Sequence, residues 1–204
     1  MFRLFFLCVV AILPLFADDT VRTETETNTS PALKDLGLSQ WLLYNHRPNA
    51  KSRFGYGFNF RYLNFLTTQR VELTASGTLY LGKGFVNLNP GRTTDGRWTT
   101  SIVGGYRFGG GWSLVALADP KWHHRVDLPT TVFKKLWVGK GPLYWRVDDF
   151  HVGNGHAYHY QGVEIRAHPM RYAELFVAPQ ISLLGPKKFV TEFGFRTSFS
   201  FPRR

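Results

Sequence analysis

The sequence predicts an all-β fold, an up-and-down antiparallel membrane β-barrel of eight to ten strands. Segments of about nine to fourteen residues alternate between apolar and polar side chains, as strands do because successive residues point to opposite faces. These segments follow one another across short turns, and no helical period appears after residue 17. A tilted strand needs roughly nine to eleven residues to cross a bilayer, whereas ordinary strands average about five or six. Segment length therefore favours a barrel in a membrane.

The N-terminal segment, residues 1–17, is typical of a secretory signal peptide. Arg3 precedes about a dozen apolar residues, and small Ala17 stands before two aspartates. The apolar run is too short for a membrane-spanning helix. Cys8, the one cysteine, lies inside this run, so the mature chain has no thiol for a disulfide or a catalytic nucleophile. We expect export, with cleavage after Ala17.

The charge balance predicts acidic partners. Lys and Arg total 25 against 14 Asp and Glu, a formal charge of +11 that falls to +10 when Arg3 leaves with the signal. Anionic lipid head groups and acidic glycans are the candidate partners, because export and the lack of long Lys/Arg runs argue against nucleic acid. No cofactor is expected, since the glycines at 104–105 and 109–111 precede no helix that would present a phosphate site.

The body is expected to begin after a polar leader. Residues 18–36 are rich in Thr, Asp and Glu, and they lack the apolar surface that would order them, so we predict a flexible segment. Residues 37–204 form the predicted barrel domain. Its first segment, 37–45, fits a strand or a short helix, and whether the extension at 81–90 pairs is left open.

Alternation and turn residues predict the remaining elements. Phe54, Tyr56, Phe58, Phe60 and Tyr62 share one face, opposite glycines and polar groups. An Asp-Gly turn at 95–96 and glycine-rich turns near 110, 141, 154 and 185 separate the segments. The residues at 119–129, with two prolines, are predicted to be an extended loop. Strands are expected at 53–62, 71–81, 98–108, 112–118, 130–138, 143–152, 156–167, 172–184 and 188–201.

The last segment shows the two faces most clearly. One parity carries a row of aromatic side chains that we expect to face lipid: Phe189, Phe193, Phe195, Phe199 and Phe201. The opposite parity carries Glu192 and Arg196, which are then expected to line the lumen.

Opposite charges on the polar faces predict a network inside the barrel. An isolated buried charge costs several kcal/mol, so charges in a narrow lumen must pair. We expect the acidic side chains to meet the basic ones across the lumen, in a network of Arg61, Glu72, Arg107, Glu174, Glu192 and Arg196.

These features together resemble a small bacterial outer-membrane β-barrel protein. The resemblance covers roughly residues 53–201 and is architectural. It implies an outer-membrane location, contact with membrane lipid and assembly by the barrel assembly machinery, which commonly reads a terminal aromatic residue. Here Phe201 is followed by Pro202, Arg203 and Arg204. The implied function is a structural, adhesion or lipid- or ligand-contact role with a mostly filled lumen.

Two other functions stay open at this level. A secreted soluble β-barrel that binds a small or lipid ligand would bury the Phe row instead. Small barrels also include enzymes that modify the acyl chains of surface lipid, and the weak catalytic candidates here are His151, His156 and Asp149. No metal site is expected, because His156 and His159 lie three residues apart on opposite strand faces.

Overall fold

The computed structural model describes residues 19–29, 37–49, 51–65, 68–122, 131–153, 155–185 and 188–201. These residues form twelve β-strands and one short 3-10 turn, η1 (Gly109–Gly111). The strands are β1 (Asp19–Thr29), β2 (Gly37–His46), β3 (Phe54–Phe65), β4 (Thr68–Leu81), β5 (Gly84–Thr93), β6 (Trp98–Arg107), β7 (Trp112–Trp122), β8 (Thr131–Lys140), β9 (Leu143–Val152), β10 (Gly155–Met170), β11 (Ala173–Leu184) and β12 (Phe189–Phe201). The all-β prediction is confirmed, but eight to ten strands was too few.

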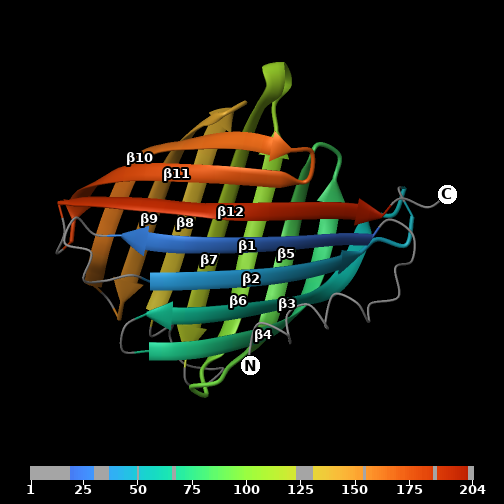
Figure 1. Ribbon diagram of the computed structural model, residues 1–204. Helices are drawn as coiled ribbons and strands as arrows, with labels where there is room; N and C mark the ends of the chain where they lie inside the picture. Colours follow the sequence, from blue (N-terminus) through green and yellow to red (C-terminus); the bar gives the residue numbers. More distant parts are fainter. Residues whose placement is uncertain are drawn as a thin grey trace.

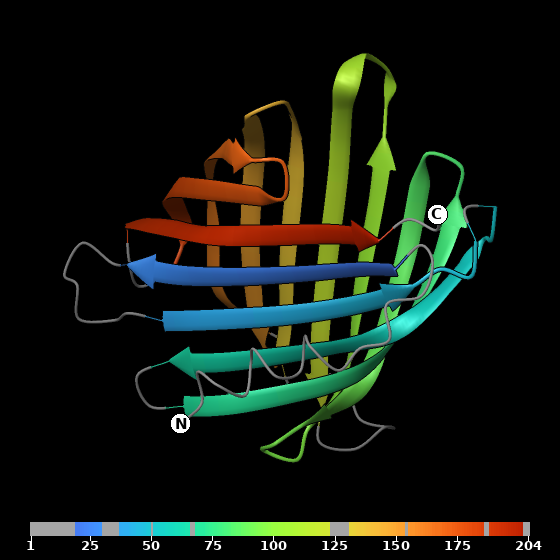
Figure 2. The ribbon, with the colours of Figure 1, turned by 45° about the vertical axis from the view of Figure 1, so that its right-hand side comes forward.

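The strands form one closed antiparallel barrel in which each strand pairs with its neighbours in sequence. Closure is made by β1 and β12, with Asp19 opposite Phe201 and Thr29 opposite Thr191. Figure 1 shows β1 lying between β12 and β2. In both Figure 1 and Figure 2 the strands of the near wall cross those of the far wall at a steep angle. Such crossing is expected when barrel strands tilt away from the axis. Closure leaves none of the twelve described strands with an unpaired edge, as a bilayer requires.

The prediction of a flexible leader is wrong for residues 19–29, which form β1 between β12 and β2. Its polar residues do not prevent pairing, because Glu24 lies opposite Arg196 and their side chains join at 2.8 Å. The alternating threonines are β-branched and suit a strand. Pairing on both edges therefore orders a segment that has little apolar surface of its own. The predicted signal peptide lies outside the described residues.

Two further segments are more regular than expected. Residues 37–46 form strand β2, not a helix, and residues 84–93 pair as β5. The loop predicted from Asp119 is wrong for its first residues, because β7 continues to Trp122. The register between β6 and β7 is the same on both sides of Pro120, at the pairs Ile102–Ala118 and Thr99–Lys121, although Pro120 itself does not pair with β6. A proline without an N–H interrupts a ladder here without ending the strand.

The barrel has two distinct ends. One end, here called the tight-turn end, holds the start of β1, the end of β12 and the short connections at 82–83, 141–142 and 171–172. Gly82 and Gly141 adopt positive φ values of 60° and 58° in two of these turns. The opposite end holds the connection at 94–97 among others, and residues 123–130, which follow β7 in the sequence, lie outside the described set.

The two faces of the barrel wall have the polarity of a membrane barrel. Phe189, Phe193, Phe195 and Phe199 are exposed on the outside, whereas Glu192 and Arg196 between them are buried in the lumen. The side chain of Phe201 is outside the described set. A collar of exposed aromatic residues surrounds the tight-turn end: Phe54, Tyr56, Tyr106, Phe108, Trp112, Trp145, Tyr172 and Phe199. An apolar outside with aromatic rings near the strand ends is the pattern of a lipid-facing surface.

Gly194 shows why glycine interrupts the polar inner face of β12. A Cβ built on Gly194 would lie 2.3 Å from the carbonyl oxygen of Thr25 and 2.6 Å from the Phe176 ring. The absent side chain lets that ring enter the lumen beside Arg196, whose guanidinium carbon lies 3.9 Å from the ring centroid. The glycine thus supports the packing around a buried arginine.

Candidate functional site: the lumen and an outer groove

A first cluster of charges connects opposite walls of the lumen. Arg61 on β3 donates from Nη1 to Asp119 Oδ2 on β7 at 2.8 Å. Lys121 Nζ lies 2.6 Å from the same Asp119 oxygen and 2.9 Å from Glu72 Oε1. The Thr99 hydroxyl donates to the other oxygen of Asp119 at 2.9 Å. Strands β3 and β7 are not neighbours, so the Arg61–Asp119 pair bridges the lumen.

A second cluster surrounds Arg146, whose side chain is completely buried. Its guanidinium donates to Asp148 at 3.1 Å, to Glu164 at 3.0 Å and to Glu192. Lys135 on β8 also donates to Glu192 on β12, at 3.1 Å, and this bond again crosses the lumen. The Trp137 indole donates to Glu164 at 2.9 Å. Each buried carboxylate here has at least one cationic or N–H partner, as burial demands.

Arg196 joins this cluster to the tight-turn end. It donates to Glu24 at 2.8 Å, to Glu164 at 2.8 Å and to Glu174 at 2.7 Å. Because the three acceptors come from β1, β10 and β11, one guanidinium ties four strands together. Planar, multiply bonded arginine is well suited to this role.

The lumen charges balance among the described residues. Seven basic and seven acidic side chains point inward, none more than 17% exposed: Arg61, Arg70, Lys121, Lys135, Arg146, Arg166 and Arg196, with Glu24, Glu72, Asp119, Asp148, Glu164, Glu174 and Glu192. The strands bring oppositely charged groups together at the centre, so these fourteen side chains carry no net charge.

Five of the six predicted network residues lie in the lumen. Arg61 is 3.7 Å from Glu72, and Arg196 is 2.7 Å from Glu174. Glu192 is buried but pairs with Lys135 and Arg146. Arg107 does not join them, because it ends β6 at the tight-turn end and its side chain is exposed. The predicted inward face of Arg107 agrees with the alternation along β6, but the residue lies at the barrel rim and not inside the lumen.

Several residues of the network were not predicted, and their strands explain why. On β9, Arg146 and Asp148 face the lumen, while Asp149 and His151 of similar polarity face outward. An alternation of apolar and polar residues is absent there, so the pattern does not choose a face. Asp119 and Lys121 fell in the predicted loop. The signal that could have found these residues is their spacing: Arg146 and Asp148, like Asp119 and Lys121, are two residues apart and so share one face of a strand.

Two of the weak catalytic candidates, Asp149 and His151, lie on the outer face of the wall. His151 Nε2 is 2.6 Å from Asp149 Oδ2 and 3.2 Å from Lys134 Nζ, and His159 Nδ1 is 3.5 Å from Asp149 Oδ1. His156 pairs with His151 across the β9–β10 turn, but its side chain is outside the described set, as are His123 and His124. Within the described part of the chain, no cluster of three or more His, Cys, Asp or Glu side chains is arranged to hold a metal ion.

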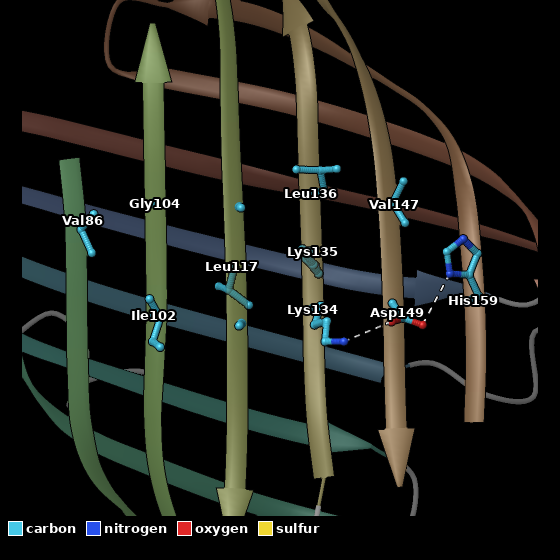
Figure 3. A pocket seen from close by; sticks show the side chains of 12 residues that line it. Val86, Ile102, Gly104, Leu117, Lys134, Lys135, Leu136, Val147, Asp149 and His159 are labelled. Carbon is cyan, nitrogen blue, oxygen red and sulfur yellow. Dashed lines mark ion pairs between the residues drawn. The ribbon is translucent and has the colours of Figure 1, made fainter. Parts of the chain in front are cut away.

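An apolar groove runs beside this group on the outer face. It has a volume of about 530 Å³ and includes Lys134, Asp149 and His159 at one side. Figure 3 shows Asp149 between Lys134 and His159, with Val147 and Leu136 further along the same strands. A second hollow of about 260 Å³ at the tight-turn end is lined by four arginines among other residues: Arg22, Arg166, Arg171 and Arg196.

The turn between β5 and β6 carries the one acidic side chain that is exposed among the described residues. Partial burial raises the pKa of Asp95, but hydrogen bonds from Arg97 and Thr93 and the charges of Arg97 and Arg70 outweigh it and lower the pKa to about 2. This carboxylate is ionised at neutral pH and fastens the turn to β5.

Comparison with solved structures shows the fold that this geometry indicates. The chain is similar to the NanC porin, with a TM-score of 0.56 and 8% identity over 90% of this chain and 100% of that one. It is also similar to the KdgM porin, with a TM-score of 0.55 and 11% identity over 88% and 99%. A membrane protein from a study of in-meso crystallization matches with a TM-score of 0.61 and 9% identity over 91% and 85%. The architecture is therefore that of outer-membrane β-barrels.

Sequence comparisons add no assignment. No family model matches the chain, and no curated protein matches it.

Proposed function

We propose that this protein resides in an outer membrane as a β-barrel whose lumen is closed by side chains and whose functional surface is its lipid-facing exterior. The observation that carries the proposal is the bridging of the lumen by ion pairs within an apolar outer wall. Arg61 and Asp119 connect β3 with β7, and Lys135 and Glu192 connect β8 with β12. A small solute would have to separate these buried pairs to pass, which would leave buried charges without their partners.

Twelve strands alone do not decide whether a barrel conducts. Eight strands leave an interior that side chains fill, whereas sixteen to eighteen leave a water-filled channel. In this barrel long arginine, lysine and glutamate side chains occupy the centre, and Arg146 and Glu164 are 0% exposed. This filling supports a structural or lipid-contact role over free diffusion.

Membrane residence is tested by fractionation and by gel mobility. The full chain, expressed with its N-terminal segment in a Gram-negative host, is expected in the outer-membrane fraction and to need detergent for extraction. Folded barrel should migrate differently from the boiled sample. A monomer that stays soluble without detergent would overturn the proposal and favour a secreted ligand-binding barrel.

Closure of the lumen is tested by single-channel recording in planar bilayers. We expect little or no conductance from the unaltered protein. A variant with Arg61→Ala and Asp119→Ala, which removes both partners of one bridge, should conduct more than a control with Arg107→Ala at the exposed rim. A large, steady conductance from the unaltered protein would contradict the closed lumen.

A second candidate function is the capture of an anionic solute at the tight-turn end. Four arginines surround the hollow there, and Arg22 and Arg171 are exposed. One KdgM porin structure is a complex with disordered oligogalacturonate, an acidic saccharide, and has a TM-score of 0.54 to this chain. Titration with trigalacturonate should then show binding that Arg171→Ala weakens, and a neutral trisaccharide should not bind. Equal behaviour of the two saccharides would remove this candidate.

A further inference from the structure

Ionisable side chains on a lipid-facing wall call for an explanation. Lys134, Asp149, His151 and His159 all point outward, because the alternating positions Lys135, Asp148 and Tyr160 are buried in the lumen. Lys134 lies three residues from the start of β8. At about 3.3 Å per residue and a tilt of about 40°, its Cα is roughly 7–8 Å inside the strand end. Charged groups at such depth are costly and are usually functional.

Small residues make the wall beside this group concave. Gly104, Ala116 and Ala118 form the floor of the groove, and Val86, Ile102 and Leu136 are among the larger residues that border it. A Cβ on Gly104 would meet one atom at 3.9 Å, the carbonyl oxygen of Phe85, so the floor is open on its outer side. The groove surface is almost wholly apolar and would therefore favour contact with a hydrocarbon chain.

The groove is inclined across the wall. Strand pairing leads from His159 through Asp149, Lys134, Ala118 and Ile102 to Leu88. Asp149 is three residues from the end of β9, at the end of the barrel opposite the tight turns. Val86 is two residues from the start of β5, at the tight-turn end. The polar side of the groove is therefore nearer one membrane surface, and its apolar side reaches toward the other.

We propose that this groove is a binding site for one membrane lipid with an anionic phosphate head group. The acyl chain lies on Gly104, Ala116 and Ala118, and the phosphate accepts hydrogen bonds from Lys134 and the imidazole of His159. The inclination matches a lipid whose head is at one surface and whose tail points toward the bilayer centre. The inference rests on the membrane location proposed above.

Exposure within the polar group favours an anion. The Lys134 side chain is 49% exposed and that of His159 31%, whereas that of Asp149 is 15% exposed. The carboxylate lies beneath its donors and is already satisfied by His151 at 2.6 Å and Lys134 at 3.8 Å. The groups that reach the surface are thus N–H donors, which phosphate oxygens complement.

The test measures lipid retention by native mass spectrometry of the detergent-purified full chain. Dioleoyl phosphatidylglycerol and dioleoyl phosphatidylcholine, with identical acyl chains, are titrated separately. Both lipids carry the phosphate, but the choline ammonium of phosphatidylcholine offsets its negative charge. We therefore expect one phosphatidylglycerol to bind about tenfold more tightly than one phosphatidylcholine. Lys134→Gln should abolish the preference, and Lys140→Gln, at the exposed other end of β8, should keep it.

A second variant tests the acyl-chain part of the site. Ala116→Leu fills the floor and should weaken both lipids about tenfold, whereas Ala75→Leu, an equal change on the exposed outer face of β4, should not. Heat-dependent gel mobility confirms that each variant is folded. Equal binding of the two lipids, or unchanged binding in both Lys134→Gln and Ala116→Leu, would overturn the proposal. So would a dimer that Ala116→Leu dissociates, because the groove would then hold a second copy.

This outcome is separable from that of the proposed function. A chain that needs detergent and shifts on boiling but shows no lipid preference refutes the lipid site alone. A chain that is soluble without detergent refutes the membrane location, whatever lipid it retains.

Discussion

Replacing Arg146 with methionine tests whether the lumen network stabilises the barrel. The arginine is completely buried and holds Asp148, Glu164 and Glu192. Without it, Glu192 keeps Lys135 and Glu164 keeps Arg196. Asp148 keeps the hydrogen bond from the neutral amide of Gln180, at 2.9 Å. One buried carboxylate charge then lacks compensation, so we expect a loss of about 3–5 kcal/mol in the free energy of unfolding.

The assay is urea unfolding in lipid vesicles, followed by tryptophan fluorescence and by heat-dependent gel mobility. Arg107→Met is the matched control, because Arg107 is exposed at the rim, and it should change stability by no more than about 0.5 kcal/mol. Adding Asp148→Asn to Arg146→Met should recover part of the loss, since it removes the stranded charge. A loss below about 1 kcal/mol for Arg146→Met, or no recovery in the double variant, would refute this account of the network.

Three other predictions follow from the same geometry. Single and double replacement of Arg61 and Asp119 by alanine in a double-mutant cycle, measured by urea unfolding, should give a coupling energy of about 0.5–3 kcal/mol, and additive effects would contradict the bridge. Phe195→Arg, at the middle of β12, should cost about 2–4 kcal/mol in vesicles, whereas Phe189→Arg at the strand end should cost about 0–1, and equal costs would argue against a bilayer around this strand. Asp95 has a pKa lowered from 3.8 to about 2, so its stabilisation is complete above pH 3.8 and disappears as pH falls toward 2; Asp95→Asn should lose this acid dependence in thermal melts, and an unchanged melting profile would refute the role of the turn.

The barrel could be predicted from strand length and alternation, because the aromatic rows at 54–62 and 189–201 repeat every second residue. The strand count could not, because β1 carries threonines and charges and gains its order from pairing with β12 and β2. That closure is a contact between the two ends of the chain, which no local pattern contains. The loop predicted at Pro120 was wrong for the opposite reason. Proline is a local signal for a loop, but here pairing with β8 keeps the residue in a strand.

The sequence predicted that charged side chains would pair inside the lumen, but only some of the pairs themselves. Arg61, Glu72, Glu192 and Arg196 lie on strands with one clearly apolar face, so their direction followed from parity. Which carboxylate meets which cation depends on the stagger between strands that are distant in sequence, as in the pairing of Lys135 with Glu192. Asp149 and His151 were singled out by their chemistry, but their outward direction was not predicted, because polar residues on a lipid-facing wall break the alternation on which direction was judged.

Beyond the balanced set of lumen charges, exposed basic side chains of the described residues gather at one end of the barrel. Seven exposed basic side chains lie at the tight-turn end: Arg22, Lys51, Arg53, Lys83, Arg107, Lys140 and Arg171. In the described part of the chain the exposed acidic residue is Asp95, at the other end. A basic ring next to an aromatic collar fits a surface of phosphate-bearing head groups, and each cation near such a surface contributes about 1 kcal/mol of attraction. This attraction is screened within about 10 Å at 0.1 M salt, so under the proposed function it would act on the ends of the barrel at the bilayer surface and not on the lumen charges.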